Sequence, residues 1–249
     1  GLRRPAEADR VPHVGAFELI MEEGATFAPL YVVGAAGSEK RTIYLAKGAR
    51  VLGAVLYVDG GDIFIGEETV LEPTAAVKGP AIIGRRNEIR QGAYFRGNVI
   101  LGSQKKLGDN AFRGELKNVL MLDEANFPHP SYLGDSICGY NAHWGNEGTA
   151  ANLGIIQGIR DRAKRVNLSV QIGGKWYDLG RPKMGVVMGD KTQLACETVT
   201  DPGTLLGPMC ISYPLAYIRS GYYPGGTMFK TRADHYVETQ AGRFDPGKI

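Results

Sequence analysis

The sequence predicts an all-β protein, a solenoid of six-residue (hexapeptide) repeats with an N-terminal cap and an inserted β-hairpin. The first observation behind this prediction is a row of large apolar residues at a constant spacing of six, namely Ile65, Leu71, Val77, Ile83, Ile89, Phe95 and Leu101. A helix places apolar residues three and four apart, and a simple strand alternates them. A period of six is instead typical of a β-solenoid, in which each hexad forms one short strand and one turn.

Two further observations define the coil. A small or compact residue follows four positions after each of the first six apolar residues, and these are Thr69, Ala75, Ala81, Asn87, Ala93 and Val99. Glycine recurs every eighteen residues, at Gly66, Gly84 and Gly102. Three hexads per coil make a triangular prism, with apolar residues inside and compact residues where two faces meet. Coils then stack about 4.8 Å apart. The alternative is chance alternation in an ordinary sheet rich in valine and isoleucine.

Residues 1–42 lack the hexad phase, and we expect them to cap the solenoid. A short helix is predicted from Ala16 to Glu23, followed by strands at Leu30–Val33 and Thr42–Leu45 around a turn at Gly37–Ser38. A cap is needed because the first coil of a solenoid otherwise exposes an unpaired strand edge.

Residues 43–230 are predicted to form the solenoid domain. It begins with three residues at the same spacing, Leu45, Val51 and Tyr57. A slip of two residues near Gly60–Gly61 joins them to the main phase, which continues after Leu101 through Leu107–Gly108. The phase then blurs over 117–152, and blurring of a repeat often marks inserted loops or function.

A change from hexads to alternation predicts the inserted hairpin at about 166–180. Apolar residues alternate along its first half, at Val166, Leu168, Val170 and Ile172. The pair Gly173–Gly174 supplies a tight turn, and Trp176 and Leu179 follow in the second half.

After the hairpin the hexads resume, with apolar residues on multiples of six at Met188, Leu194, Leu206 and Ile218. The residues from Tyr222 onward are rich in glycine, proline and charge, and we expect them to pack along the outside or onto a neighbouring subunit. We assign 231–249 as a C-terminal tail.

Composition narrows the function classes. The 249-residue chain has a formal net charge of only +3, so nothing indicates the basic surface that nucleic-acid binding requires. Its three cysteines, Cys138, Cys196 and Cys210, are scattered and odd in number, which predicts neither a disulfide framework nor a zinc site. No apolar run approaches the roughly 20 residues that span a bilayer, and residues 1–10 do not begin a signal peptide. A cytoplasmic protein without membrane contact is expected.

The segment 115–152 carries a resemblance to a known family. It contains E-L-K-N at 115–118, a histidine at 129 and S-Y-L-G-D at 131–135, and G-R-P-K-M-G-V-V-M-G-D follows at 180–190. These motifs resemble the acetyltransferase domain of bifunctional N-acetylglucosamine-1-phosphate uridyltransferase/glucosamine-1-phosphate acetyltransferases and of related sugar-phosphate nucleotidyltransferases. The resemblance covers roughly 45–230 and implies a left-handed parallel β-helix. The family's glycine-rich nucleotide loop is absent from this sequence, so uridylyl transfer is not predicted.

The resemblance implies an acyl transfer from acetyl-CoA to a sugar phosphate or nucleotide sugar. An attacking amine or hydroxyl must lose a proton, and a histidine with a pKa near neutrality suits that task. The matching positions make His129 the general base and Lys117 the phosphate-binding lysine. Either Arg90 or Arg96 would add a forked phosphate contact.

Further positions carry over as substrate contacts. Tyr132 matches a sugar-contacting tyrosine, and Asn152 matches the asparagine that closes the family's G-A-G-T-x-x-x-N stretch. Backbone N–H groups of that stretch would stabilise the oxyanion. The family also implies a homotrimer, with acyl-donor sites between adjacent prisms.

This sequence departs from the pattern at two places. His143 stands at a family asparagine, and G-A-G-T becomes Gly145, Asn146, Glu147 and Gly148. The glutamate adds charge and bulk where substrate and thioester should meet. Either the acceptor differs, or acyl transfer has been lost and the chain is a sugar-nucleotide-binding or scaffold protein, or a partner subunit of a separate nucleotidyltransferase.

Less specific readings of these residues exist. His129 lies between two prolines, as a surface histidine often does; Lys117 could be a solvated charge and Tyr132 a packing residue. Imidazole and carboxylate are good metal ligands, so His129, His143 and Glu147 also permit a metal site. Their spacing of fourteen and four residues is weak support for it, and no metal is assigned.

Overall fold

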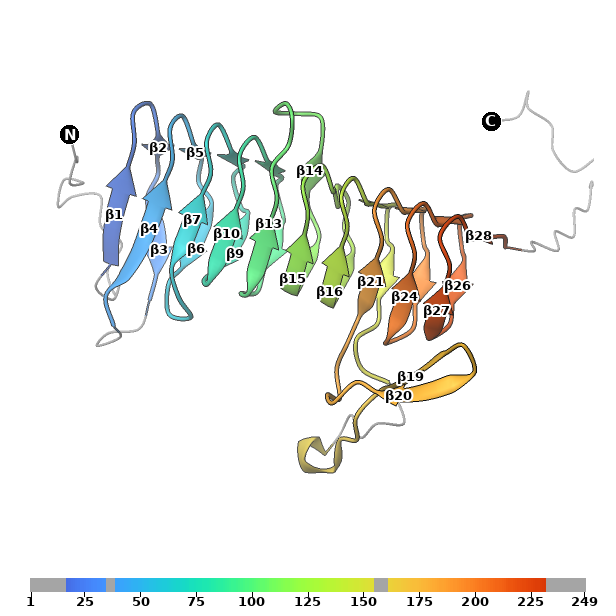
Figure 1. Ribbon diagram of the computed structural model, residues 1–249. Coiled ribbons are helices and arrows are strands. Elements are labelled where there is room, and N and C mark those ends of the chain that lie inside the picture. Colours follow the sequence, from blue (N-terminus) through green and yellow to red (C-terminus); the bar gives the residue numbers. More distant parts are fainter. Residues whose placement is uncertain (1–16, 35–38, 155–160, 232–249) are drawn as a thin grey trace, which may run out of the picture.

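The computed structural model describes residues 17–34, 39–154 and 161–231 (Figure 1). Its strands stack in parallel as the coils of a β-solenoid with three faces, as predicted. In Figure 1 the strands of one face run upward on the near side, and the chain returns behind them while it advances from the N-terminus to the C-terminus. The coil is therefore left-handed.

The near face, called here the first face, is a ladder of parallel strands in consecutive coils. They are β1 (Phe17–Met21), β4 (Arg41–Leu45), β7 (Ile63–Ile65), β10 (Ala81–Ile83), β13 (Val99–Leu101), the second half of β15 (Glu115–Met121), the second half of β16 (Tyr132–Cys138), β21 (Val186–Met188), β24 (Thr204–Leu206) and β27 (Gly221–Tyr223). Their residues pair directly, for example Ile65 with Ile83 and Ile83 with Leu101.

The second face follows each of these strands along the chain. It holds β2 (Thr26–Phe27), β5 (Arg50–Val51), β8 (Val70–Leu71), β11 (Glu88–Ile89), β14 (Ala111–Phe112), β17 (His143–Trp144), β22 (Gln193–Leu194), β25 (Ile211–Ser212) and β28 (Met228–Phe229). Single bridges at Phe127 and Asn126 continue it between β14 and β17.

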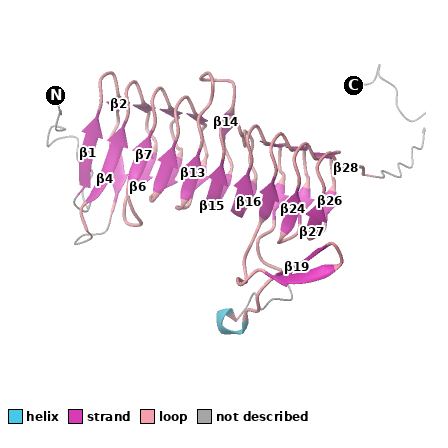
Figure 2. Cartoon of the chain, in the orientation of Figure 1, coloured by secondary structure: helices cyan, strands magenta, loops and turns pink. Residues whose placement is uncertain are grey.

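The third face completes each coil. It holds β3 (Tyr31–Val33), β6 (Val55–Tyr57), β9 (Ala76–Lys78), β12 (Tyr94–Phe95), the first halves of β15 and β16, β18 (Thr149–Ala150), β23 (Val199–Thr200) and β26 (Tyr217–Ile218). Figure 2 shows how little helix accompanies these strands: a short 3₁₀ helix at Arg162–Lys164. No helix in the described part of the chain has the length and apolarity to cross a membrane.

The hexad residues form the core of the prism. All seven apolar residues from Ile65 to Leu101 are at most 1% exposed, and the six compact residues between them are at most 2% exposed. The later hexad residues Met188, Leu194, Leu206 and Ile218 are buried as well. The prediction of an inward apolar row with compact residues at the corners is confirmed.

The glycines at eighteen-residue intervals stack on one another. A Cβ atom on Gly66 would lie 2.5 Å from the carbonyl carbon of Gly84, and one on Gly84 would lie 2.5 Å from the carbonyl oxygen of Gly102. Both contacts are with backbone, which cannot rotate away. These positions therefore require glycine because neighbouring coils approach too closely for any side chain.

At two positions the sequence predicted the wrong residue to point into the core. Leu56, and not Tyr57, pairs with Val77 and is fully buried, while Tyr57 faces outward. Phe112, and not Leu107, stacks on Ile89, because residues 102–110 form a longer connection than the other coils have. The turn before Leu56 is one residue shorter than the equivalent turn before Val77, and the connection before Phe112 is longer than in other coils; each change in turn length shifts the phase.

The predicted helix at Ala16–Glu23 is also wrong. Phe17–Met21 is strand β1, which pairs with β4 and packs Phe17, Leu19 and Met21 against the core, an alternation of period two. Part of the segment expected to cap the solenoid thus forms its first coil. The turn at Gly37–Ser38 lies outside the described residues.

At the other end, Tyr222 belongs to the solenoid and does not begin a separate tail. It lies in β27, which pairs with β24, and β28 follows it on the second face. Residues 232–249 lie outside the described residues.

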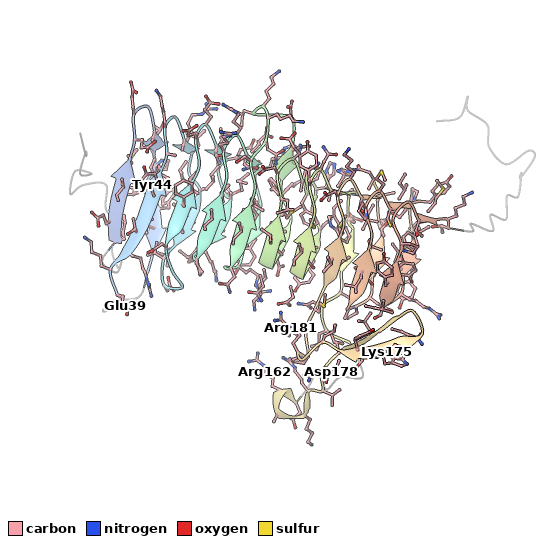
Figure 3. The ribbon with its side chains drawn as sticks, viewed as in Figure 1. Glu39, Tyr44, Arg162, Lys175, Asp178 and Arg181 are labelled. Carbon is pink, nitrogen blue, oxygen red and sulfur yellow. The ribbon has the colours of Figure 1, made fainter. Side chains whose placement is uncertain are left out.

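The inserted hairpin is present as predicted. Its strands β19 (Ser169–Ile172) and β20 (Lys175–Asp178) are antiparallel, and both turn glycines, Gly173 and Gly174, have positive φ, as this turn requires. Leu168 and Val170 are buried, whereas Trp176 is 65% exposed. The hairpin lies beside the last coils, and Figure 3 labels Lys175 and Asp178 on it.

We predict that Gly84→Ala lowers the free energy of unfolding by about 1–3 kcal/mol, the usual cost of overpacking. The new methyl group has to push two backbones apart. The measurement is urea denaturation followed by circular dichroism.

The control is Gly92→Asn. A Cβ there meets nothing within 4 Å, and asparagine tolerates its φ of +81°. An equal loss of stability in both variants would contradict close coil stacking as the reason for the glycine.

Candidate functional site

The predicted site residues lie along the third face and its two edges, in the middle coils. Strand β15 crosses the edge between the third and first faces: Glu115 and Leu116 pair with β12, and Val119 to Met121 pair with β13. Strand β16 does the same one coil later. The corner residues Asn118 and Asp135 have φ of 54° and 52°, a left-handed conformation that asparagine and aspartate tolerate better than most residues.

A hydrogen-bonded row of side chains follows this corner. The Asn98 amide donates to Asn118 (2.9 Å), and the Asn118 amide donates to the Asp135 carboxylate (2.7 Å). From the other side, the Asn152 amide donates to the second carboxylate oxygen of Asp135 (2.5 Å) and to the Tyr132 hydroxyl (3.0 Å). Asp135 thus fixes Asn152, which in turn positions the Tyr132 hydroxyl.

The environment keeps Tyr132 protonated. Burial raises the pKa of Tyr132, and the Asp135 and Glu115 carboxylates raise it further, against smaller opposite effects of Arg96 and Asn152. Since the hydroxyl already accepts from Asn152, its own proton is free to be donated to a bound molecule.

The structure separates the two arginine candidates. Arg96 lies on the third face, where its guanidinium pairs with Glu115 at 2.6 Å. Lys117 lies one coil further along the same face, in register with Gly134. Arg90 lies at the end of β11 on the second face and pairs with Glu88 at 2.7 Å. Arg96 is therefore the arginine on the same face as Lys117, Tyr132 and Asn152.

The histidines lie at the opposite edge of the third face. His129 is exposed in the turn between Phe127 on the second face and Tyr132 on the third. His143 is half-buried on the second face, with its Nδ1 2.5 Å from the Asn126 amide oxygen. An amide oxygen only accepts, so Nδ1 carries the proton and Nε2 remains an acceptor. Burial lowers the pKa of His143, and nearby His129 lowers it further.

The stretch 145–148 forms the turn of the next coil, and most of its backbone N–H groups are used there. The N–H of Gly145 donates to Leu194, that of Glu147 to Pro130 and that of Gly148 to Gly145. Within the described residues, Asn146 is the one member of this stretch whose N–H has no acceptor. Of the backbone N–H groups expected to bind an oxyanion, the Asn146 N–H is therefore the one that remains available.

Glycines 145 and 148 serve coil packing. A Cβ on Gly145 would lie 2.4 Å from the backbone nitrogen of Cys196, and one on Gly148 would lie 2.7 Å from the Trp144 ring. Glu147 occupies the corner between them with a φ of 57°, and its side chain is exposed. Its backbone bond to Pro130 places this glutamate beside the turn that carries His129.

A metal site is the alternative interpretation of His129, His143 and Glu147. In the described ranges, no three side chains of histidine, cysteine, aspartate or glutamate gather to hold a metal ion. The three cysteines are free, and burial raises the pKa of Cys138 to about 12.

Sequence reasoning missed the residues that hold the site together. Asp135 belongs to the quoted Y-L-G-D motif but received no role, and Asn98, Asn118 and Asn126 were not singled out. Part of this corner could have been predicted from residue spacing. Asn98, Asn118 and Asp135 are spaced by about one coil length, and all three adopt positive φ. A search for such residues at coil spacing would have found this corner.

No family model matches the chain. Among curated proteins, it is 28% identical over 180 residues to the bifunctional sugar-1-phosphate nucleotidylyltransferase/acetyltransferase of Sulfurisphaera tokodaii, covering 64% of this chain and 41% of that protein. It is 31% identical over 115 residues to the bifunctional protein GlmU of Methanococcus maripaludis, covering 46% and 25%. Against the bifunctional protein GlmU of Methanocaldococcus jannaschii, identity is 30% over 118 residues, covering 47% and 26%. The chain thus spans less than half the length of these relatives.

We predict a pH-dependent difference in stability between the wild type and His143→Gln. The folded state holds the His143 pKa below its ordinary value, so the unfolded chain binds more protons as pH falls through about 6.5. The wild type should therefore lose unfolding free energy relative to the variant below that pH, and the difference should be constant above about 7.5.

Urea denaturation of both proteins between pH 5 and 8 measures this difference. Carboxylates contribute equally to both proteins and cancel. Two curves that remain parallel over the whole range would show that His143 is not held neutral by its surroundings.

Proposed function

We propose that this protein transfers an acyl group, an acetyl group by its family resemblance, from acyl-CoA to a sugar phosphate or nucleotide sugar, with His129 as general base. The name of one relative, the protein of Sulfurisphaera tokodaii, includes both an acetyltransferase and a sugar-1-phosphate activity. The observation that carries the proposal is the gathering of Arg96, Lys117, Tyr132 and Asn152 on one face, one turn away from an exposed histidine.

Each group has a distinct task in this proposal. The Lys117 ammonium and the Arg96 guanidinium bind the phosphate, the latter as a fork. Tyr132, oriented by Asn152, donates its hydroxyl proton to the sugar. His129, exposed at the edge of the same face, accepts the proton of the attacking amine or hydroxyl.

The reaction is an addition to the thioester followed by loss of CoA. The acceptor nitrogen or oxygen attacks the thioester carbonyl carbon and gives its proton to His129. The tetrahedral oxyanion lies at the Asn146 N–H, the free donor of the turn. The carbon–sulfur bond then breaks, and the CoA thiolate takes the proton from His129.

A second candidate function is sugar-nucleotide binding without transfer. Glu147 favours it, because a carboxylate stands beside the His129 turn where the family has a small residue, and three of the four backbone donors are already occupied. This version keeps Lys117 and Tyr132 as a binding site. It predicts that calorimetry detects a phosphosugar but not CoA.

We predict that the purified protein releases free CoA from acetyl-CoA in the presence of an amino-sugar phosphate. His129→Ala should lower kcat about 10²- to 10⁴-fold, the usual contribution of a general base, with little change in substrate binding. Release is followed with a thiol reagent, and Lys40→Ala, an exposed change just before β4 and far from the site, serves as the control. Equal rates in wild type and His129→Ala would refute His129 as the base.

We further propose a homotrimer, in which the prisms contact one another through their first faces. The support is a row of outward apolar residues along the first face, one per coil: Ile20, Tyr44, Phe64, Ile82, Ile100, Leu120, Ile137, Val187, Leu205 and Tyr222. Five of them keep 39–50% of their surface exposed. Figure 3 labels Tyr44 on this near face. So long an apolar row is unusual on a free surface and typical of an interface.

We predict that the double change Ile82→Glu and Ile100→Glu dissociates the assembly, because it places charges in the apolar row. Light scattering after gel filtration should give three times the mass of one chain for the wild type and a single chain mass for the variant. Ile211→Glu, on the second face, should leave the mass unchanged. A wild type that is strictly monomeric would contradict the trimer.

A further inference from the structure

Lys78, Arg96 and Lys117 form a row of cations on the third face, on three successive coils. Val77 pairs with Phe95, and Phe95 pairs with Leu116, so the next residues along these strands are level with one another. A Cβ atom on Gly97 would lie 3.1 Å from the carbonyl oxygen of Gly79, which extends the same register by one residue. The rungs of the row are about 4.8 Å apart.

The three cations of this row have only one carboxylate partner among the described residues. Glu115 pairs with Arg96. Among the described residues, neither Lys78 nor Lys117 has a carboxylate within 4 Å. Like charges on adjacent rungs repel one another, and a bound anion removes that cost. The row is therefore suited to a ligand with more than one negative charge.

Aromatic rings surround the first rung. The Lys78 ammonium lies 5.1 Å from the centre of the Tyr57 ring and 5.5 Å from that of Tyr94. Such cation–π contacts hold the ammonium on the face without consuming its N–H donors in hydrogen bonds. The side chains of Tyr57, Lys78 and Tyr94 are half-buried, so each still presents part of its surface to solvent. A flat base could stack on the exposed ring surface.

We propose that the acceptor bound on this face is a nucleoside diphosphate sugar rather than a sugar monophosphate, with its second phosphate on Lys78. This inference rests on the proposed function and specifies its substrate class. Lys117 and Arg96 suffice for one phosphate next to a sugar at Tyr132. Lys78 lies one rung beyond Arg96, on the side away from Tyr132. A second phosphate, joined to the first through one bridging oxygen, would reach this rung, and the attached nucleoside would extend further in the same direction. The nucleoside then lies at Tyr94 and Tyr57.

The test is calorimetric titration with two probes, UDP-N-acetylglucosamine and N-acetylglucosamine 1-phosphate. The wild type should bind the first at least tenfold more tightly. Lys78→Ala should weaken that binding about tenfold and leave the monophosphate unaffected, since one charge-assisted hydrogen bond is lost. Lys78→Arg should retain most of the affinity, and Lys117→Ala should weaken both probes.

The control is Lys175→Ala. Lys175 also lies over a tyrosine ring, 5.2 Å from the centre of Tyr177, but on the hairpin, so its loss should change neither affinity. Thermal unfolding of each variant separates a lost contact from a lost fold, and Lys78→Gln replaces Lys78→Ala if the latter is unstable.

The outcomes distinguish this inference from the proposed function. Equal wild-type affinity for both probes, or equal weakening of both by Lys78→Ala, overturns the diphosphate site while a phosphosugar site remains. If neither probe binds, the proposed function fails together with it.

Discussion

The close parallel stacking of one coil on the next is the constraint on which the rest of this structure depends. Backbone hydrogen bonds join each strand to its counterpart about eighteen residues away, and Gly66, Gly84 and Gly102 keep the backbones too close for any side chain between them. Every outward residue consequently lies beside the equivalent residue of the next coil. Rows of like side chains follow: the apolar row on the first face, the corner amides, and the cations of the third face.

This constraint explains which features were predictable. The apolar hexads and stacked glycines are repeated, so their period alone identifies the prism and its core. The paired glycines 173 and 174 identify the hairpin because a tight turn needs residues that adopt positive φ. Errors arose where a turn differs in length from the others, because the sequence does not show at which residue the phase resumes. The core residues are therefore Leu56 instead of Tyr57 and Phe112 instead of Leu107. The helix predicted at Phe17–Met21 was a separate error, because so short an alternation was not recognised as a strand.

The candidate site shows a similar division. The family resemblance predicted the site residues, but only coil register could separate Arg96 from Arg90, since both lie at least one coil before the E-L-K-N motif. Which backbone N–H groups of 145–148 remain free depends on pairing with other coils, and no local pattern reports it. The same holds for Lys78, which becomes a neighbour of Arg96 only when the coils are stacked.

We propose that coil register places a phosphosugar on the third face, between the cation row and the His129 edge. A crystal structure with CoA and a nucleotide sugar bound is the decisive measurement. We expect phosphates along Lys78, Arg96 and Lys117, the attacking atom within about 2.6–3.2 Å of the His129 imidazole, and the thioester carbonyl at the Asn146 N–H. A sugar bound on another face, or a Glu147 carboxylate filling the thioester path with no CoA bound, would contradict it.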